Sequence, residues 1–493
     1  MKAFFKKYLL VCGILANATF LYVGYKAVTT VFLESPSFPQ AIHSLSARLQ
    51  PHIPLASSLL SGFVSNVTAA DYFPATFIPE ITPERWPTVG PATTFSTDEF
   101  QPRETVRVSD ANALLLAIKQ AQPGQAIVIS DGEYRLSGKR FAISQSRPTA
   151  SNPIYLRSET PGGVTLKLDS LEGFMIDQPH WYIEGINFQG ICAQHSRCDH
   201  ALHIVGAASH TIIRNNQFYD FNAAIKVNQL KGQFPDYGII ERNRFGMHQP
   251  RETNASVTPI NLDHGSGWKV RQNLIHDFIK TGGNKVSYGA YMKGGSLHGV
   301  FEQNLIICNT SQTQYPGSRV GLSFGGGGMH QKQRRDQAEF EVSQAVMRNN
   351  IILHCNDVGI YSQTAKDVTI NNNILYHTAG IDVRFPQSKA EVYNNVMNGK
   401  IRERDGALSH QTNNFIAPLS YWTGKNSLKA VYAAPESGDF TLVNPEPLLD
   451  HSVNARRSAG NFSDYCGNPI KNGTAYLGAI YDSARCFQPS RLP

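Results

Sequence analysis

The chain has 493 residues, of which 41% are hydrophobic, 10% aromatic and 17% charged. This composition is too apolar for a disordered protein, and 40 glycines and 27 prolines interrupt the chain too often for a bundle of helices. The net charge of +7 is a mild basic bias that is compatible with a polyanionic partner. Seven cysteines in a chain of this length exclude a small disulfide scaffold. We therefore expect a globular protein that is rich in β-structure.

The N-terminal segment predicts export. Three lysines within the first seven residues precede an apolar run over residues 8–25. This order is typical of a signal peptide, with small residues for cleavage at 16–18, but the run also approaches the roughly 20 residues that span a bilayer. Residues 1–33 are therefore either a cleaved signal or a membrane anchor, and the rest of the chain lies in the cell envelope, for example the periplasm, or is secreted. Residues 34–104, rich in Pro, Ser and Thr, are interpreted as a tether.

The body of the chain repeats a short segment in which an asparagine stands between hydrophobic residues. The asparagines fall at Asn216, Asn243, Asn273, Asn304, Asn350, Asn373 and Asn395, with spacings of 27, 30, 31, 46, 23 and 22 residues. A period of about 20–30 residues with β-branched residues and glycine turns is typical of a parallel β-solenoid, in which each coil pairs with the coils beside it. We interpret the asparagines as a ladder that bonds neighbouring coils and not as catalytic groups.

The repeats resemble those of the pectin-lyase-like right-handed parallel β-helix proteins. The segment SDANALLLAIKQAQPGQAIVISDGEYRLSG (109–138) resembles the start of the chondroitinase B and alginate lyase family, in which a capping helix precedes the first coil. NPIYLRSETPGGVTLK (152–167) and WYIEGINFQG (181–190) resemble its early coils. The resemblance implies an all-β chain with a single right-handed parallel β-helix over 105–416, an N-terminal cap helix, and a cap segment over 417–493 that covers the last coil.

A second strand in each coil predicts a row of polar side chains on the outer surface. Strand alternation puts Ile260 and Leu262 inside the coil and turns their neighbours outward. The same alternation along the repeats turns out Lys226, Asn228, Asn261, Asp263, Tyr291, Lys293, Ser323, Tyr361, Asp382, Arg384, Arg402 and Arg404. Because adjacent coils are about 4.8 Å apart, these side chains are expected to form one external column.

Lys293 is the centre of this column. The segment YMKGGSLHGVFEQNLIICN, which contains it, resembles the chondroitinase B stretch that carries the catalytic lysine of that family, with Lys293 at the matching position. β-Elimination on a uronate needs a base for the proton α to the carboxylate and a positive group for the developing enolate. Partial burial would give the lysine the lowered pKa that a base needs. The alternative is a solvated lysine paired with Asp263. Tyr291 and His264 are further candidate catalytic residues.

Two properties of that family are not matched here. The family has a catalytic arginine on the next coil, where this chain reads GLSFGGGG; Arg319 is the nearest substitute, and Arg384 lies three coils further on. The family also holds Ca²⁺ with acidic residues just before the lysine, where this chain reads VSYGA. Asn261 and Asp263 remain as weak candidate ligands for a calcium ion, since two oxygens alone make a poor site.

The longest interval of the ladder contains an insertion with four glycines (325–328) and the basic run HQKQRRD (330–336). Arg334 and Arg335 suit the recognition of a carboxylate or sulfate through bidentate bonds, and a disordered basic loop is the alternative. With these two arginines, the predicted substrate-binding residues are Asp263, Tyr361 and Arg384.

Three classes of function agree with this pattern. The first is an exported enzyme that modifies an acidic, uronate-containing polysaccharide by proton abstraction at C5, as a lyase or an epimerase. The second is a glycan-binding or structural β-helix protein without catalysis. The third, a glycoside hydrolase, is disfavoured because the clustered aspartates of such enzymes are absent. The expected partners are an acidic polysaccharide and, through the N-terminal segment, a membrane, but no nucleic acid, and we expect a monomer.

Six cysteines lie in the exported body, an even number that favours pairing. Cys192–Cys198 flank one short loop and Cys466–Cys486 bracket the C-terminal segment, and both pairs are predicted disulfides. Cys308 and Cys355 follow the ladder strand on consecutive coils, where the spacing of about 4.8 Å suits a disulfide. A one-residue offset between them would instead leave two stacked thiols in the core.

Overall fold

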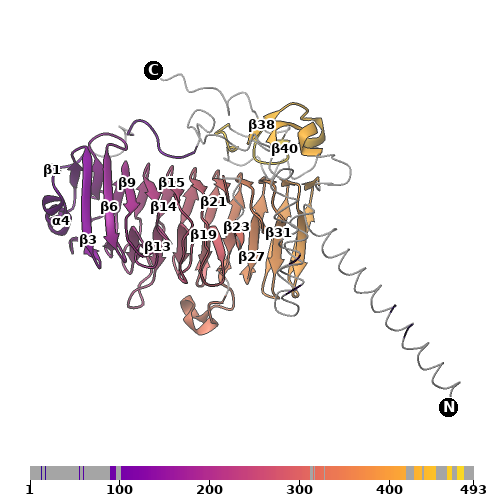
Figure 1. Cartoon of the computed structure of the whole chain (residues 1–493), viewed down its shortest axis with the longest axis horizontal. Coiled ribbons are helices and arrows are strands. Elements are labelled where there is room, and N and C mark those ends of the chain that lie inside the picture. The colour runs from indigo at the N-terminus through magenta and orange to yellow at the C-terminus, as the bar shows by residue number, and fades with distance from the viewer. Residues whose placement is uncertain are drawn as a thin grey trace, which may run out of the picture.

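Three sheets of parallel strands wind into a right-handed β-helix around one continuous core (Figure 1). The computed structural model describes residues 89–95, 101–310, 315, 317–326, 328–417, 427–435, 438–450, 463–468 and 475–481, and the single residues 13, 17, 55 and 59. The predicted signal or anchor and most of the predicted tether lie outside the described residues. No helix in the described part of the chain is long and apolar enough to cross a membrane.

Each coil contributes one strand to each sheet. Sheet A has 12 strands: β1 (Glu104–Val108), β2 (Gln125–Ile129), β5 (Ile154–Ser158), β8 (Trp181–Glu184), β11 (Ile212–Arg214), β14 (Ile239–Glu241), β17 (Lys269–Arg271), β21 (Val300–Glu302), β25 (Val346–Arg348), β29 (Val368–Asn371), β32 (Lys389–Tyr393) and β35 (Leu408–Thr412). Sheet B has 11 strands: β3 (Gly132–Gly138), β6 (Val164–Ser170), β9 (Ile186–Gly190), β12 (Gln217–Tyr219), β15 (Arg244–Gly246), β18 (Leu274–His276), β22 (Leu305–Ile307), β26 (Ile351–Leu353), β30 (Ile374–Tyr376), β33 (Val396–Met397) and β36 (Phe415–Ile416).

Sheet C has 10 strands and carries the predicted polar column. They are β4 (Phe141–Ala142), β7 (Phe174–Ile176), β10 (Leu202–Val205), β13 (Ile225–Asn228), β16 (Ile260–Asp263), β19 (Val286–Lys293), β23 (Ser318–Phe324), β27 (Ile360–Gln363), β31 (Gly380–Arg384) and β34 (Lys400–Arg404). A minor sheet of β20 (Ser296–Leu297), β24 (Val342–Ser343) and β28 (Ala365–Lys366) lies at the turn that follows sheet C.

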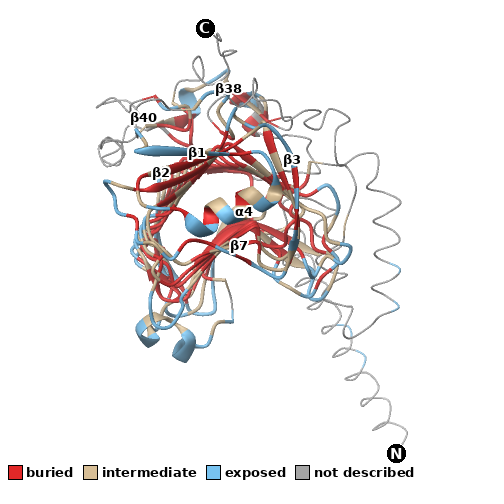
Figure 2. Ribbon diagram, turned by 90° about the vertical axis from the view of Figure 1, so that its left-hand side faces the viewer, coloured by how far each residue is buried: buried red, intermediate tan, exposed pale blue. Residues whose placement is uncertain are grey.

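Helix α4 (Ala111–Gln120) closes the N-terminal end of the coil, as predicted. Asp110 caps it, because its Oδ1 accepts a hydrogen bond from the Ala113 backbone N–H at 2.9 Å. Leu114 and Ile118 are fully buried against the first coil. Seen along the coil axis, α4 lies across the opening that the three sheets surround (Figure 2). The helix therefore shields the core at this end.

The asparagine ladder is present and has the structural role that was predicted. Asn304 shows the pattern: its Oδ1 accepts from the backbone N–H of Asn273 at 3.1 Å, and its Nδ2 donates to Asn350 Oδ1 at 3.0 Å. The same bonds join the ladder residues from Asn216 onward and continue one rung further, to Asn414. Each ladder residue follows a residue with a positive φ, such as Gln303 at 57°, which makes the sharp turn from sheet A to sheet B.

The C-terminal segment packs against the flank of the solenoid. The segment contains strands β37 (Tyr432–Ala434), β38 (Asp439–Leu442), β39 (Leu449–Asp450) and β40 (Ala475–Tyr476) and short helices η3 (Ser427–Ala430) and η5 (Glu446–Leu448). The elements β37, β38, η3 and η5 contribute buried apolar side chains. These cover the outward residues of sheet B, among them Leu305, Ile351 and Ile374. The described residues of the segment lie along the side of several coils, including the last one, where Phe415 of β36 packs against them (Figure 1).

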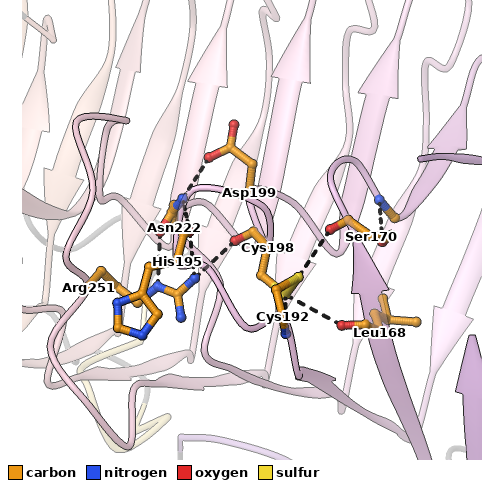
Figure 3. The surroundings of a disulfide bond; sticks show 9 residues. Leu168, Ser170, Cys192, His195, Cys198, Asp199, Asn222 and Arg251 are labelled. Atoms are coloured by element: carbon orange, nitrogen blue, oxygen red, sulfur yellow. Dashed lines mark hydrogen bonds between the residues drawn. A yellow bond between two sulfur atoms is a disulfide. The ribbon is translucent and has the colours of Figure 1, made fainter. Parts of the chain in front are cut away.

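Two predicted disulfides are confirmed. Cys192–Cys198 closes the short loop, with a Cα–Cα distance of 5.6 Å, and Cys308–Cys355 joins consecutive coils at 4.9 Å. Arg251 holds the first loop: its Nη2 donates to the carbonyls of His195 at 2.9 Å and Cys198 at 3.4 Å (Figure 3). Cys466 is also disulfide-bonded. Its predicted partner, Cys486, lies outside the described residues.

Candidate active site on the outer face of sheet C

The strand register of sheet C brings the predicted column together. Asn261 pairs with Tyr291, and Asp263 pairs with Lys293, between β16 and β19. The first row continues through Ser323 on β23 to Tyr361 on β27, while Ile260 and Leu262 are fully buried inside the coil. Strand alternation therefore produced the correct outward face. The insertion projects beyond this sheet, next to the coils of β19 and β23 (Figure 1).

Lys293 is mostly enclosed. Its side chain is only 16% exposed, and its Nζ lies 3.5 Å from Asp263 Oδ2 and 5.0 Å from the centre of the Tyr291 ring. The glycine run of the insertion lies on the stem of this lysine, since a Cβ at Gly326 would come within 2.5 Å of Lys293 Cδ. The lack of a side chain at Gly326 thus permits a close approach of the backbone to the lysine.

The charge environment of Lys293 differs from the expectation for a base. Burial lowers the pKa of the ammonium, but Tyr291, Asp263 and Glu341 together outweigh burial, and the net effect raises the pKa. The prediction of a lowered pKa was therefore wrong. Three groups that stabilise the ammonium surround it.

Asp263 is shared between two lysines. Lys226 on β13 donates from Nζ to Asp263 Oδ2 at 2.7 Å and to Asn261 Oδ1 at 3.0 Å. Burial alone would raise the pKa of Asp263, but Lys226 and Lys293 lower it below its ordinary value. The two candidate calcium ligands thus already bind an ammonium. Among the described residues, no three His, Cys, Asp or Glu side chains are placed to hold a metal ion.

His264 holds the insertion. Its Nε2 lies 2.7 Å from the backbone carbonyl of Gln333 in helix η1 (Gln331–Gln333), and its side chain is only 9% exposed. Its Nδ1 is 3.7 Å from Asp263 Oδ1, so the predicted neighbours do lie together. The contact with η1 shows that this histidine supports the wall of the site.

Tyr361 and Arg384 lie in the same outward face, two and three coils beyond Lys293. Arg384 Nη1 donates to the Tyr361 hydroxyl at 3.1 Å, and its Nε binds Asp405. Hydrogen bonds to Tyr361 and Asp405 raise the pKa of Arg384. Asp382, in the same row as Tyr361, is paired by the guanidinium groups of Arg402 and Arg404. This end of the column is consequently rich in arginine and keeps part of each guanidinium at the surface.

Arg319 is not brought to Lys293. It pairs in register with Ser287, and Lys293 stands six residues further along β19, about 20 Å away at the rise of a strand. Its side chain is buried, donates to the Tyr315 carbonyl at 3.2 Å, and has a pKa that burial lowers to about 10, with Asp277 opposing the shift. The structure therefore does not support Arg319 as the partner of Lys293.

Arg334 and Arg335 hold the insertion in place. Arg335 Nη1 donates to Asp236 Oδ1 at 2.9 Å and to Ser266 Oγ at 3.1 Å, and its guanidinium lies over the Phe234 ring at 4.2 Å. Arg334 donates to backbone carbonyls within the loop, including that of Glu339 at 2.7 Å. Both guanidinium groups thus have partners within the protein, and the alternative of a disordered loop is not what the structure has.

We expect Arg335→Ala to release the insertion. Loss of the contacts to Asp236 and Ser266 should increase trypsin cleavage between residues 329 and 338 by about tenfold, because cleavage follows the population of the open loop. Limited proteolysis with mass spectrometry measures this. Arg107→Ala, which removes an arginine that is 63% exposed, is the control. Equal cleavage of all three proteins would contradict the anchoring role.

The sequence did not predict three neighbours of Lys293 and Tyr361, namely Tyr288, Gln363 and Glu341. Tyr288 lies beside Tyr291, with ring centres 5.5 Å apart. Its hydroxyl lies near Gln363 and Tyr361, and burial raises the pKa of this phenol. Glu341 accepts from the Gly326 N–H at 2.7 Å beside Lys293. Strand alternation alone could not have revealed them, because alternation gives the face of a residue and not its neighbours on other elements.

The sheets and the outward column define the class of fold as the pectin-lyase-like right-handed parallel β-helix. No known protein-family model matches the chain, and no curated protein matches its sequence. Among solved structures, the pectate lyase Pel9A is similar with a TM-score of 0.51 and 14% identity, over 78% of this chain and 98% of that one. An alginate lyase from Paenibacillus sp. str. FPU-7 has a TM-score of 0.37 and 16% identity, over 64% and 96%. The A-module of the Azotobacter vinelandii mannuronan C-5 epimerase AlgE4 has 0.40 and 14%, over 63% and 92%. At 14% identity, the likeness to the pectate lyase shows the fold alone.

Proposed function

We propose that this protein modifies an acidic, uronate-containing polysaccharide by removing the C5 proton, as a lyase or an epimerase. The observation that carries the proposal is the enclosed Lys293, which lies beside Asp263 and Tyr291 on the outer face of sheet C. The similarity in fold to a pectate lyase agrees with it. An extended row of polar side chains across parallel coils suits a polymer that lies along the solenoid.

In the proposed reaction, Lys293 Nζ in its neutral form takes the proton from C5 of the uronate. The electron pair of that bond forms the C4–C5 double bond, the C4–O4 bond breaks, and the leaving oxygen takes a proton from Tyr291. In an epimerase, the proton would instead return to the opposite face of C5. Arg384 lies on β31, two coils beyond Ser323 on β23, and would bind a further carboxylate of the same polymer.

An exported location belongs to the same proposal. Disulfides persist in oxidising compartments such as the periplasm or the extracellular space, and this chain forms them at Cys192–Cys198 and Cys308–Cys355. The basic and apolar N-terminal sequence agrees with export.

The proposal is tested by incubating the protein with polygalacturonate, alginate or chondroitin and following the absorbance at about 235 nm. This absorbance rises only if elimination creates a double bond conjugated with the carboxylate. Because the pKa of Lys293 is raised, its neutral fraction is small at neutral pH and grows as the pH rises toward that pKa. The rate should therefore increase by about tenfold per pH unit through the alkaline range. Exchange of the C5 proton with deuterium, without absorbance, would identify an epimerase. A rate that is independent of alkaline pH would contradict Lys293 as the base.

The second candidate function is glycan binding without catalysis. Its specific support is the raised pKa of Lys293, since a lysine that stays charged binds carboxylates well but is a poor base. Calorimetric binding of an oligouronate, with neither absorbance at about 235 nm nor proton exchange at any pH, would favour this candidate.

A further inference from the structure

Lys226 is a residue of the site for which no role was predicted. It lies on β13, directly opposite Asn261 on β16, and its side chain is only 13% exposed. Its ammonium contacts Asn261 Oδ1 at 3.0 Å and Asp263 Oδ2 at 2.7 Å. These are the two oxygens that the sequence offered to a calcium ion. A fixed positive charge therefore already stands where that ion would bind.

The residues around these oxygens do not fit calcium. A calcium ion takes about 6–8 oxygen ligands at about 2.3–2.6 Å, and a neighbouring ammonium supplies repulsion instead of a ligand. A further carboxylate beside Lys293 is that of Glu341 on the insertion, which accepts from the Gly326 N–H at 2.7 Å and lies 4.0 Å from Arg334. This carboxylate already has partners within the protein. Among the described residues, no third His, Cys, Asp or Glu joins a group that could hold a metal ion.

The distribution of charge leaves the site positive. Asp263 is closer to Lys226, at 2.7 Å, than to Lys293, at 3.5 Å, so Lys226 takes the shorter ion pair. Two ammonium groups around one carboxylate leave a net positive charge in an enclosed position. The groups that face Lys293 are Tyr291 on its own strand, Asp263 with Lys226 on the preceding coils, and Glu341 with Arg334 on the insertion. Such a site attracts an anion such as a uronate carboxylate.

We propose that Lys226 is the resident cation of this site: it takes the place of a divalent ion at Asn261 and Asp263, holds Asp263 away from Lys293, and makes uronate binding independent of metal. This inference rests on the proposed function. Lys226 is a positioning residue for Lys293 in this scheme. It also provides positive charge for the substrate carboxylate.

Substitution at Lys226 tests the positioning role. In Lys226→Met the charge is lost at similar length, and Asp263 is left to Lys293 alone, which favours the charged form of Lys293. The alkaline rise of the rate should move up by about one pH unit, and the KM for the best oligouronate should increase by about tenfold. Lys226→Arg keeps the charge and should therefore have nearly the wild-type pH profile and KM. A Lys226→Met enzyme with the wild-type pH profile and KM would overturn the inference.

Metal dependence of the full-length wild-type protein separates this inference from the proposed function. Activity should survive dialysis against EGTA and should change less than about twofold on adding Ca²⁺. Activity that EGTA abolishes and Ca²⁺ restores would overturn the resident-cation role while upholding the proposed reaction. Absence of activity on every polymer would refute the proposed function alone.

Terbium luminescence tests the inference without any turnover. Tyr291, which pairs with Asn261, would sensitise a Tb³⁺ ion bound at Asn261 and Asp263. Wild-type protein and Asp263→Asn should therefore show the same emission on titration with Tb³⁺. Emission that is present in the wild type and lost in Asp263→Asn would show a cation at these oxygens and overturn the inference.

Discussion

Lys293→Ala is expected to lower the rate of elimination or C5 exchange by at least about 10²-fold, the contribution of a positioned general base. The fold should survive, because Asp263 keeps its shorter ion pair with Lys226 and is not left as an unpaired buried charge. Rate measurements at about 235 nm, with thermal unfolding followed by circular dichroism, check both parts. Lys293→Arg is a second variant, which keeps the charge but cannot act as a base.

Lys269→Ala is the matched control for Lys293. Lys269 is an exposed residue at the start of β17, on sheet A and not on the proposed catalytic face. It should retain the wild-type rate. If Lys293→Ala is as active as this control, Lys293 is not the base. A Lys293→Arg protein that binds oligouronate but does not turn it over would assign the loss to proton transfer.

Asn304→Ala is expected to destabilise the protein by about 2–5 kcal/mol, because it removes a rung from the middle of the ladder. The backbone N–H of Asn273 and the carbonyl of Val270 would each lose a hydrogen bond in a fully buried position. Urea unfolding measured by circular dichroism gives the difference. The expected cost is well above that of an exposed substitution, which is usually within about 0.5 kcal/mol.

Asn414→Ala is the comparison for this effect. Asn414 is the last rung of the described ladder, and its bonds to Asn395 are only partly buried, so water can replace them. Its loss should cost about 1 kcal/mol. Equal destabilisation by the two substitutions would show that burial of the ladder does not set its strength.

The fold could be predicted because its signals are local in the sequence. The ladder repeats in every coil, and strand alternation alone placed Asp263, Tyr291 and Lys293 on one face. The period of two residues fixes such a face once one strand is aligned. The coil spacing likewise brought Cys308 and Cys355 within reach of each other, although it left open whether they form a disulfide or two stacked thiols, and the structure has the disulfide.

The chemistry of the site could not be predicted in the same way. Whether Asp263 contacts Lys293 or Lys226 more closely depends on side-chain conformations across coils, which alternation does not specify. Arg335 was predicted to bind substrate because it lies in a basic run. Its partner, Asp236, is 99 residues away in the sequence, so the sequence could not show that this arginine anchors the insertion. The prediction for Arg319 was wrong for another reason. Arg319 pairs with Ser287, six residues before Lys293, and each residue along an extended strand adds about 3.3 Å of distance.

The C-terminal cover of sheet B changes how the solenoid should lose its structure. Coils that touch only their neighbours can open one after another from an end. Here Gln303 bonds to Asp464, 161 residues away, and Asn372 bonds to Tyr481, 109 residues away. A coil beneath this cover cannot open without first releasing it, which links several coils into one cooperative unit. During synthesis the apolar flank of those coils, from β18 to β36, stays open to water until the cover has been made, so the C-terminal half of the solenoid is the last part to be sealed.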